Sequence, residues 1–328
     1  MSENLAVAPV VGKRVVSVSL GTSKRNKSYS INILGQDFFI ERLGMDGDFK
    51  KFKSKLLELD GVVDAIGFGG VDIYVKIGEE SYTFRQIKKL KDLVKVTPIA
   101  DGSGVKHTLE REAINEIQKS GILDFANERV LLVSAVDRFG MAQALDKVCP
   151  HMIYGDLLFA LGLPIRLTSY RSVERLGRIT LPIITKLPFK WFYPTGEKQE
   201  KRTPKFPKIF AECTVIAGDW HYIHRYAPEQ MEGKTIITQT VRTADLEWLK
   251  KAGVLRVITT TPLMGGETFA TNVIEGILIA LTGKKGSDVG EMEYINLLKK
   301  LDWKPNVIEL QAPKVSETGS PFSLRWQA

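Results

Sequence analysis

Lys106 is a candidate for proton transfer in a cleft. It follows the glycine-rich turn Asp101-Gly-Ser-Gly104 at the start of a predicted helix. A lysine in that position can act as a general acid or bind a carboxylate, with Asp101 to orient it. An ordinary cap and loop is the alternative interpretation. We therefore treat Lys106 as a candidate catalytic residue.

Asp137 and His221 are the other two catalytic candidates. Asp137 falls in the turn before a predicted helix, where an aspartate either caps the helix or takes part in the chemistry. His221 lies in a strand-end segment beside Asp219 and Arg225. Metal binding there would need a third ligand, so proton transfer is the favoured role and no metal site is expected.

A further set of polar residues at predicted strand ends is typical of a nucleotide site. Asp156 ends a strand about 20 residues after the first strand–helix turn, where a dinucleotide-binding unit places the acid that binds a ribose hydroxyl. Ser134 and Gly140 would border the pyrophosphate, although that turn has one glycine where the fingerprint has three. The other members of the set are Thr238, Thr259 and Thr260. NAD or NADP is the expected cofactor, while ordinary strand and turn preferences are the alternative explanation.

Strand and helix alternate through the second half of the chain. Strands are predicted at Val130–Ser134, Met152–Tyr154, Thr214–Ala217, Thr235–Thr238 and Leu255–Thr259, and helices at Phe139–Val148, Ser169–Leu187, Thr243–Ala252 and Phe269–Leu281. Apolar strands in this order predict a parallel sheet covered on both faces, with every carboxyl end on one rim. That rim is where a ligand should bind.

The first half predicts an α/β unit as well. Its strands and helices end near Gly121–Glu128, and a polar segment follows the last predicted helix of the chain. The predicted fold class is therefore α/β with two tandem domains, the second a Rossmann-like parallel sheet with helices on both faces. The predicted boundaries are 14–125 for a substrate domain, 126–302 for a nucleotide-binding domain and 303–328 for a tail.

Composition narrows the class of protein. The chain has 328 residues and a formal charge of +8, which favours anionic partners. Two cysteines without paired spacing indicate neither disulfides nor a zinc site. No apolar run is long enough to span a membrane and no secretion signal is visible, so a cytoplasmic protein is expected. A small-molecule substrate and a homo-oligomer are expected.

A basic and aromatic segment covers residues 186–208. It holds seven Lys or Arg and two Glu, interleaved with Phe, Trp and Tyr. With the apolar residues before it, 181–208 is compatible with a membrane-surface contact or a lid over substrate, or with a solvated loop. Single-stranded nucleic acid is disfavoured because no recognised binding module accompanies it.

Several segments together resemble a known family. They are Arg14–Gly21, Asp64–Asp72, Val133–Ala142, Gly155–Phe159, Tyr193–Gly196, Ile216–Asp219 and Thr259–Pro262. This set resembles bacterial proteins that carry the name quinate 5-dehydrogenase, over about residues 14 to 284. The resemblance implies nicotinamide-dependent oxidation of a cyclic polyol acid.

The sequence thus predicts an NAD(P)-dependent oxidoreductase acting on a small oxygenated acid such as a cyclic polyol carboxylate. The alternative is a non-redox nucleotide- or phosphometabolite-binding protein, or a transferase, of the same fold. A protein acting at a membrane surface is a third class.

Overall fold

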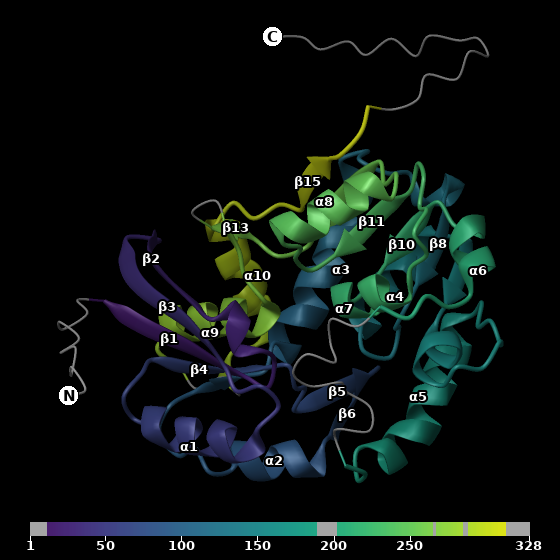
Figure 1. The fold of residues 1–328 in the computed structure, drawn as a ribbon. Coiled ribbons are helices and arrows are strands. Elements are labelled where there is room, and N and C mark those ends of the chain that lie inside the picture. Colours follow the sequence, from purple (N-terminus) through teal and green to yellow (C-terminus); the bar gives the residue numbers. More distant parts are fainter. Residues whose placement is uncertain (1–11, 189–201, 265–266, 285–287, 313–328) are drawn as a thin grey trace, which may run out of the picture.

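The computed structural model describes residues 12–188, 202–264, 267–284 and 288–312, and it forms two lobes, each built around one sheet (Figure 1). The elements up to residue 119 are β1 (Lys13–Ser19), β2 (Lys27–Ile33), β3 (Gln36–Gly44), α1 (Phe49–Leu59), β4 (Ala65–Gly69), β5 (Tyr74–Ile77), β6 (Glu80–Thr83), α2 (Arg85–Lys91), β7 (Ile99–Ala100) and α3 (Ser103–Lys119). The predicted α/β fold class is confirmed.

The first sheet has the strand order β2-β3-β1-β4-β7 and is parallel except for β2 at its edge. Alternate side chains of a strand point to opposite faces, and β1 shows this directly. Val16 and Val18 pack in the core that includes α1 and α2. Val15 packs in the core on the other face, which includes residues of α3.

The second sheet contains the strand–helix alternation that the sequence predicts. Its elements are β8 (Arg129–Leu132), α4 (Phe139–Val148), β9 (His151–Tyr154), α5 (Tyr170–Ile184), α6 (Pro207–Glu212), β10 (Val215–Ala217), α7 (Trp220–Tyr226), β11 (Thr235–Thr238), α8 (Thr243–Lys251) and β12 (Arg256–Thr259). Strands β9-β8-β10-β11-β12 are parallel neighbours, and helices cover both faces. The order turns back between β8 and β10, which is where ligands bind in such sheets.

After β12 the chain returns to the first lobe, contrary to the predicted domain of 126–302. A short hairpin of β13 (Leu263–Met264) and β14 (Glu267–Thr268) leads into α9 (Thr271–Thr282) and α10 (Glu291–Lys300). The buried apolar side chains of α9 include Val273, Ile274 and Ile277, and they complete the second face of the first sheet. A helix that is apolar on most sides needs such a buried place, and this sheet face provides it.

The predicted tail of 303–328 is also corrected at its start. Residues Asn306–Glu309 form β15, which pairs antiparallel with β12 at the edge of the second sheet. Residues 313–328 lie outside the part of the chain that the structure describes. The tail prediction therefore stays untested beyond residue 312.

Helix α3 belongs to the cores of both lobes. Val105 and Leu109 in its first half pack against the first sheet, and Ile114 and Ile117 in its second half pack against the second. Helix α5 also reaches across, with Leu181 in the core of the first lobe. The two lobes are thus joined by shared packing as well as by the chain.

The basic and aromatic segment is described only at its ends. Residues 189–201 lie outside the described part, and α5 and α6 bound the segment on either side. Along the described residues, no helix is long and apolar enough to cross a membrane.

Candidate functional site

Lys106 joins the two lobes through an ionic cluster, which we define as Asp72, Lys106, Glu110, Asp137, Arg138 and Asp219. The Nζ atom of Lys106 lies 2.7 Å from Oδ1 of Asp137 and 3.4 Å from Oδ1 of Asp72. Asp72 follows β4 of the first sheet, and Asp137 follows β8 of the second. The rims of the two sheets therefore face each other at this cluster.

Arg138 forms the inner part of the ionic cluster. Its Nη1 donates to Glu110, which lies on α3, and its Nη2 donates to Oδ2 of Asp219 at 2.6 Å. Its Nε lies 3.2 Å from Oδ2 of Asp137. Arg138 therefore crosses the point where the strand order turns back between β8 and β10, because Asp219 follows β10.

The aspartates of the ionic cluster are partly open to solvent. The side chains of Asp72, Asp137 and Asp219 keep 16%, 15% and 14% of their surface exposed, whereas Glu110 keeps 0%. The aspartates are therefore more accessible to a small molecule than the Glu110–Arg138 pair. Lys106 lies between these regions with 7% exposed.

The pKa values of Lys106, Asp137 and Asp72 are shifted in different ways. Burial alone would lower the pKa of Lys106, but Asp137 and Asp72 outweigh burial and raise it. Burial likewise opposes ionisation of Asp137, yet Lys106 and Arg138 hold its pKa below the usual range. For Asp72 burial wins and raises the pKa to about 7, because Lys106 only partly offsets it and Asp137 adds repulsion.

Asp101 has a structural role and does not orient Lys106. Its Oδ2 accepts from the backbone amides of Ile73 and Tyr74 at 2.7 and 3.1 Å. Its Oδ1 accepts from the amide and hydroxyl of Ser103 at 3.0 and 2.6 Å. Asp101 thereby fixes both the loop that carries Asp72 and the first turn of α3.

Asp156 lies at the predicted strand end but does not face outward for a ribose. Its carboxylate accepts from the amides of Ala135 and Val136 at 3.1 and 2.9 Å. These amides belong to the β8–α4 turn, where a dinucleotide would place its pyrophosphate. Burial raises the pKa of Asp156 to about 6, although the two amides oppose this. The physical reason is that the turn lacks the glycines of the fingerprint and uses the acid to hold its own backbone.

Gly140 also differs from its predicted role beside a pyrophosphate. A Cβ atom at this position would lie 2.5 Å from the carbonyl oxygen of His107, so the glycine allows α4 to approach α3 closely. Ser134, which follows β8 in the turn before α4, is buried. The turn is thus packed against the helix that carries Lys106.

The remaining predicted residues lie at the carboxyl ends of strands in the second sheet. Thr238 donates to the side-chain oxygen of Gln239 at 2.9 Å. Thr259 and Thr260 are fully buried, and their hydroxyls have no hydrogen-bond partner among the described residues. These three residues do not contact the ionic cluster directly.

His221 lies near the ionic cluster without joining it. Asp219 caps α7 by accepting from the amides of His221 and Tyr222 at 2.8 and 3.3 Å. Burial lowers the pKa of His221 even though Asp219 opposes this. The charge of Arg25, from the loop after β1, contributes to the same lowering.

Four members of the ionic cluster were not among the predicted site residues, namely Asp72, Glu110, Arg138 and Asp219. Asp72 follows the glycines at the end of β4. Glu110 is one turn after Lys106 on α3, and that i, i+4 spacing on a predicted helix was the available signal. Within the described residues, no group of three His, Cys, Asp or Glu side chains is arranged to hold a metal ion.

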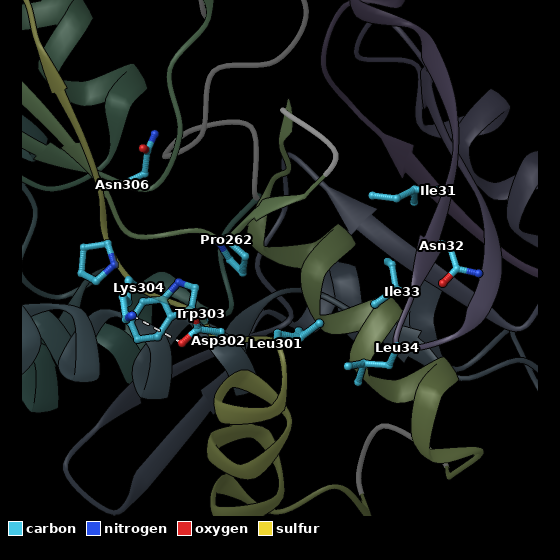
Figure 2. Close-up of a pocket in the computed structure, with 11 residues that line it drawn as sticks. Ile31, Asn32, Ile33, Leu34, Pro262, Leu301, Asp302, Trp303, Lys304 and Asn306 are labelled. Atoms are coloured by element: carbon cyan, nitrogen blue, oxygen red, sulfur yellow. Dashed lines mark ion pairs between the residues drawn. The ribbon is translucent and has the colours of Figure 1, made fainter.

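A shallow groove of about 390 Å³ lies elsewhere on the molecule. It is formed by the turn between β2 and β3 and by the connection from α10 to β15, with Pro262 between them (Figure 2). Asp302 and Lys304 form its ion pair at 3.4 Å. None of the residues of the ionic cluster lines this groove. The candidate site lies at the cluster, where charged side chains of both lobes meet.

Two protein-family models match this chain. The model of a domain of unknown function, DUF8754, matches residues 104–310, and that of another, DUF8753, matches residues 14–101. No curated protein sequence matches the chain. The two models meet at the start of α3.

Similar solved structures include dehydrogenases and sugar-binding proteins. The glutamate dehydrogenase of Thermus thermophilus is 12% identical with a TM-score of 0.40, covering 89% of this chain and 75% of that chain. The NAD-dependent malic enzyme of Thermotoga maritima is 13% identical with a TM-score of 0.34, covering 88% and 84%. The glucose-galactose binding protein GanP of Geobacillus stearothermophilus is 9% identical with a TM-score of 0.33, covering 93% and 99%. Likeness at this level carries no inference about activity.

Proposed function

The chain belongs to the family of the domain of unknown function DUF8754, and from the geometry of its site we propose that it is an enzyme that transfers protons on a small oxygenated acid. The substrate would lie between the lobes, against Asp72, Lys106 and Asp137. The observation that carries this proposal is the pair of solvent-reachable aspartates on one lysine, one of which titrates near neutral pH.

The three groups can divide the work of proton transfer. Lys106 is charged and can donate a hydrogen bond to a hydroxyl or carbonyl oxygen of the substrate, which stabilises negative charge there. Asp72 can take or give the proton, because its pKa of about 7 leaves both forms populated at neutral pH. Asp137, ionised and held by Arg138, keeps the ammonium of Lys106 in position.

The predicted nicotinamide cofactor was tested against the β8–α4 turn, and the turn does not fit it. The amides of Ala135 and Val136 already donate to Asp156, and Gly140 packs against His107. Asp137 adds a carboxylate where two phosphates would need to approach. We derive no step through NAD or NADP.

The oxidoreductase predicted from the sequence is the second candidate. The contact between Lys106 and Asp137 favours it, because oxidation of a hydroxyl also needs a group that takes the proton. Its substrate would be a cyclic polyol carboxylate such as quinate, and NAD or NADP would have to bind away from the β8–α4 turn.

Replacement of Lys106 tests the proposed function. Turnover of quinate and related hydroxy acids is followed by NMR, with and without NAD⁺ or NADP⁺. Lys106→Ala should reduce kcat/KM by about 10²–10⁴, as expected for loss of a general acid or base. Asp72→Asn should also remove the limb of the pH profile near pH 7. The control is Lys88→Ala, since Lys88 is an exposed lysine paired with Asp92.

Two results would contradict these proposals separately. Unchanged turnover in Lys106→Ala would reject the acid–base role of the ionic cluster. Calorimetric titration with NADH and NADPH at millimolar concentration addresses the second candidate. Binding to the wild type that is unchanged in Asp137→Ser would support the oxidoreductase with its cofactor away from the β8–α4 turn. Absence of binding in both proteins would leave the non-redox enzyme.

A further inference from the structure

Arg42 is a cation held by neutral acceptors at the rim of the first sheet. Its Nη2 donates to the hydroxyl oxygen of Ser19 and its Nη1 to the carbonyl oxygen of Thr22, each at 3.1 Å. Among the residues that the structure describes, no carboxylate lies within ion-pair distance of Arg42. A partly buried cation that forms no direct ion pair is costly, so this position favours an anion from outside the chain.

Arg25 adds a second positive charge at the same place. Burial, and then the nearby charge of Arg25, lowers the pKa of Arg42 to about 10, with Asp46 opposing this in part. Arg25 also acts on His221 of the second lobe. The backbone amide of Arg25 and Nη1 of Arg42 both donate to the carbonyl oxygen of Thr22, at 3.4 and 3.1 Å, so the two residues meet at one loop, where an anion would be stabilised.

The loop after β1, which carries Arg25 and faces Arg42 of β3, is held in place by backbone hydrogen bonds. The carbonyl oxygens of Ser19 and Gly21 accept from the amides of Met45 and Asp46 at 2.7 and 3.0 Å. The Gly21 amide donates to the hydroxyl oxygen of Ser19 at 3.1 Å. The site is thus organised before any ligand binds, which reduces the entropy that binding must overcome.

The position of this loop connects it to the ionic cluster. The strand order of the first sheet turns back between β1 and β4, which is where ligands bind in open sheets. Strand β4 ends at Gly69, which lies against Ser19, and the loop after it runs from Gly70 to Asp72. A small molecule touching Asp72 therefore lies beside the same pair of loops.

We infer that Arg42, Arg25 and Ser19 form an anion subsite that holds the acid group of the molecule on which the ionic cluster acts. The inference rests on the proposed function for the identity of that molecule, but the subsite itself rests on its own contacts. Arginine pairs bind both carboxylate and phosphate oxygens in a forked geometry, so these two chemistries share the site.

Calorimetric binding with three probes tests the subsite. The probes are quinate, inorganic phosphate, and myo-inositol, which is a cyclic polyol without a charge. The variants are Arg42→Gln and Arg25→Gln. The control is Arg14→Gln, because Arg14 lies in the same sheet but pairs with Glu41. We expect the Kd of quinate or phosphate to rise at least about tenfold in both subsite variants and to stay within about twofold in the control.

The pattern across probes separates the sources of the anion. A lower Kd for quinate than for phosphate assigns the subsite to a carboxylate. A lower Kd for phosphate than for quinate assigns it to a phosphate ester. Equal affinity of quinate and inositol, or an unchanged Kd in folded Arg42→Gln and Arg25→Gln, overturns the subsite. Lys106→Ala keeps failure of the two proposals apart, since the proposed function predicts that its turnover is lost whether or not the Kd of inorganic phosphate depends on Arg42 and Arg25. Circular dichroism confirms that each variant is folded.

Discussion

Buried carboxylates take different protonation states in this protein according to their neighbours. Asp219 has a lowered pKa, because Arg138 and His221 outweigh its burial. Glu275 on α9 is the opposite case, since burial and the nearby charge of Asp101 raise its pKa to about 8. Its carboxylate accepts from the amides of Gly102 and Gly104 at 2.6 and 3.1 Å, which holds α9 against the start of α3.

Glu275 should make stability fall as the pH rises. Its pKa is raised from 4.5 to about 8, so between these values the folded state binds more protons than the unfolded state. The free energy of unfolding then decreases with pH by up to about 1.4 kcal/mol per unit. Urea denaturation from pH 5 to 9 should show a smaller slope in Glu275→Gln. The exposed Glu58→Gln should keep the wild-type slope, and an equal slope in both variants would contradict the assignment.

The sequence indicated two members of the ionic cluster, Lys106 and Asp137, but not their partners. Lys106 and Asp137 were singled out separately, because each sits in a turn before a helix, and the structure brings them together. Asp156 was placed at the correct strand end, but the direction of its side chain depends on which turn amides are free. Asp72 was missed because its burial, which shifts its pKa, is set by the second lobe and is invisible in local sequence.

Among the elements, α3 and α4 show how a single small residue sets a helix contact. Gly140 on α4 faces the backbone of His107 on α3, whereas Gly177 on α5 faces the side chain of Ile77. A backbone atom cannot move aside without shifting its helix, but the end of an isoleucine side chain can. The two glycines therefore differ in what an added methyl group would cost.

Alanine at these two positions should separate the cases. In Gly140→Ala the Cβ would lie 2.5 Å from a carbonyl oxygen, and we expect a loss of about 1–3 kcal/mol in the free energy of unfolding. In Gly177→Ala the nearest atom is Cδ1 of Ile77 at 2.7 Å, and better helix propensity offsets the crowding, leaving a change within about 1 kcal/mol. Urea denaturation measures both. Equal losses would show that α4 can shift away from α3.

Elements that belong to the alternation of strand and helix were predictable, whereas α7 and β15 were not. Helix α4 was predicted with its observed bounds, Phe139–Val148, because it has an apolar stripe between two clear strands. Helix α7 has only seven residues and depends on the cap from Asp219. Strand β15 is a short edge strand whose partner lies far back in the sequence. Neither carries a periodic pattern long enough to detect.

At the scale of the whole molecule, the two lobes share structure that a division by sequence does not show. Helix α3 contributes to both cores, α5 reaches the first lobe, and α9 completes the first sheet. Such shared packing makes the lobes depend on each other for stability. Membership of α9 in the first lobe was not predictable, because its apolar pattern fits either sheet.

The chain should therefore unfold in one transition. Leu109→Ala empties space in the core of the first lobe and Ile117→Ala in that of the second, each at a cost of about 2–5 kcal/mol. Differential scanning calorimetry should show a single peak that both variants move to lower temperature. Two peaks, with each variant moving only one, would mean that the lobes are independent.

The late return of α9 to the first sheet also affects the protein while it is being made. The strands of that sheet leave the ribosome first, but the apolar face bearing Val15 and Ala65 waits for residues 271–300. At about 5–20 residues per second, this interval is on the order of ten seconds. During it the nascent chain presents a half-covered sheet, so the cell has to shield this protein from aggregation until its synthesis is almost finished.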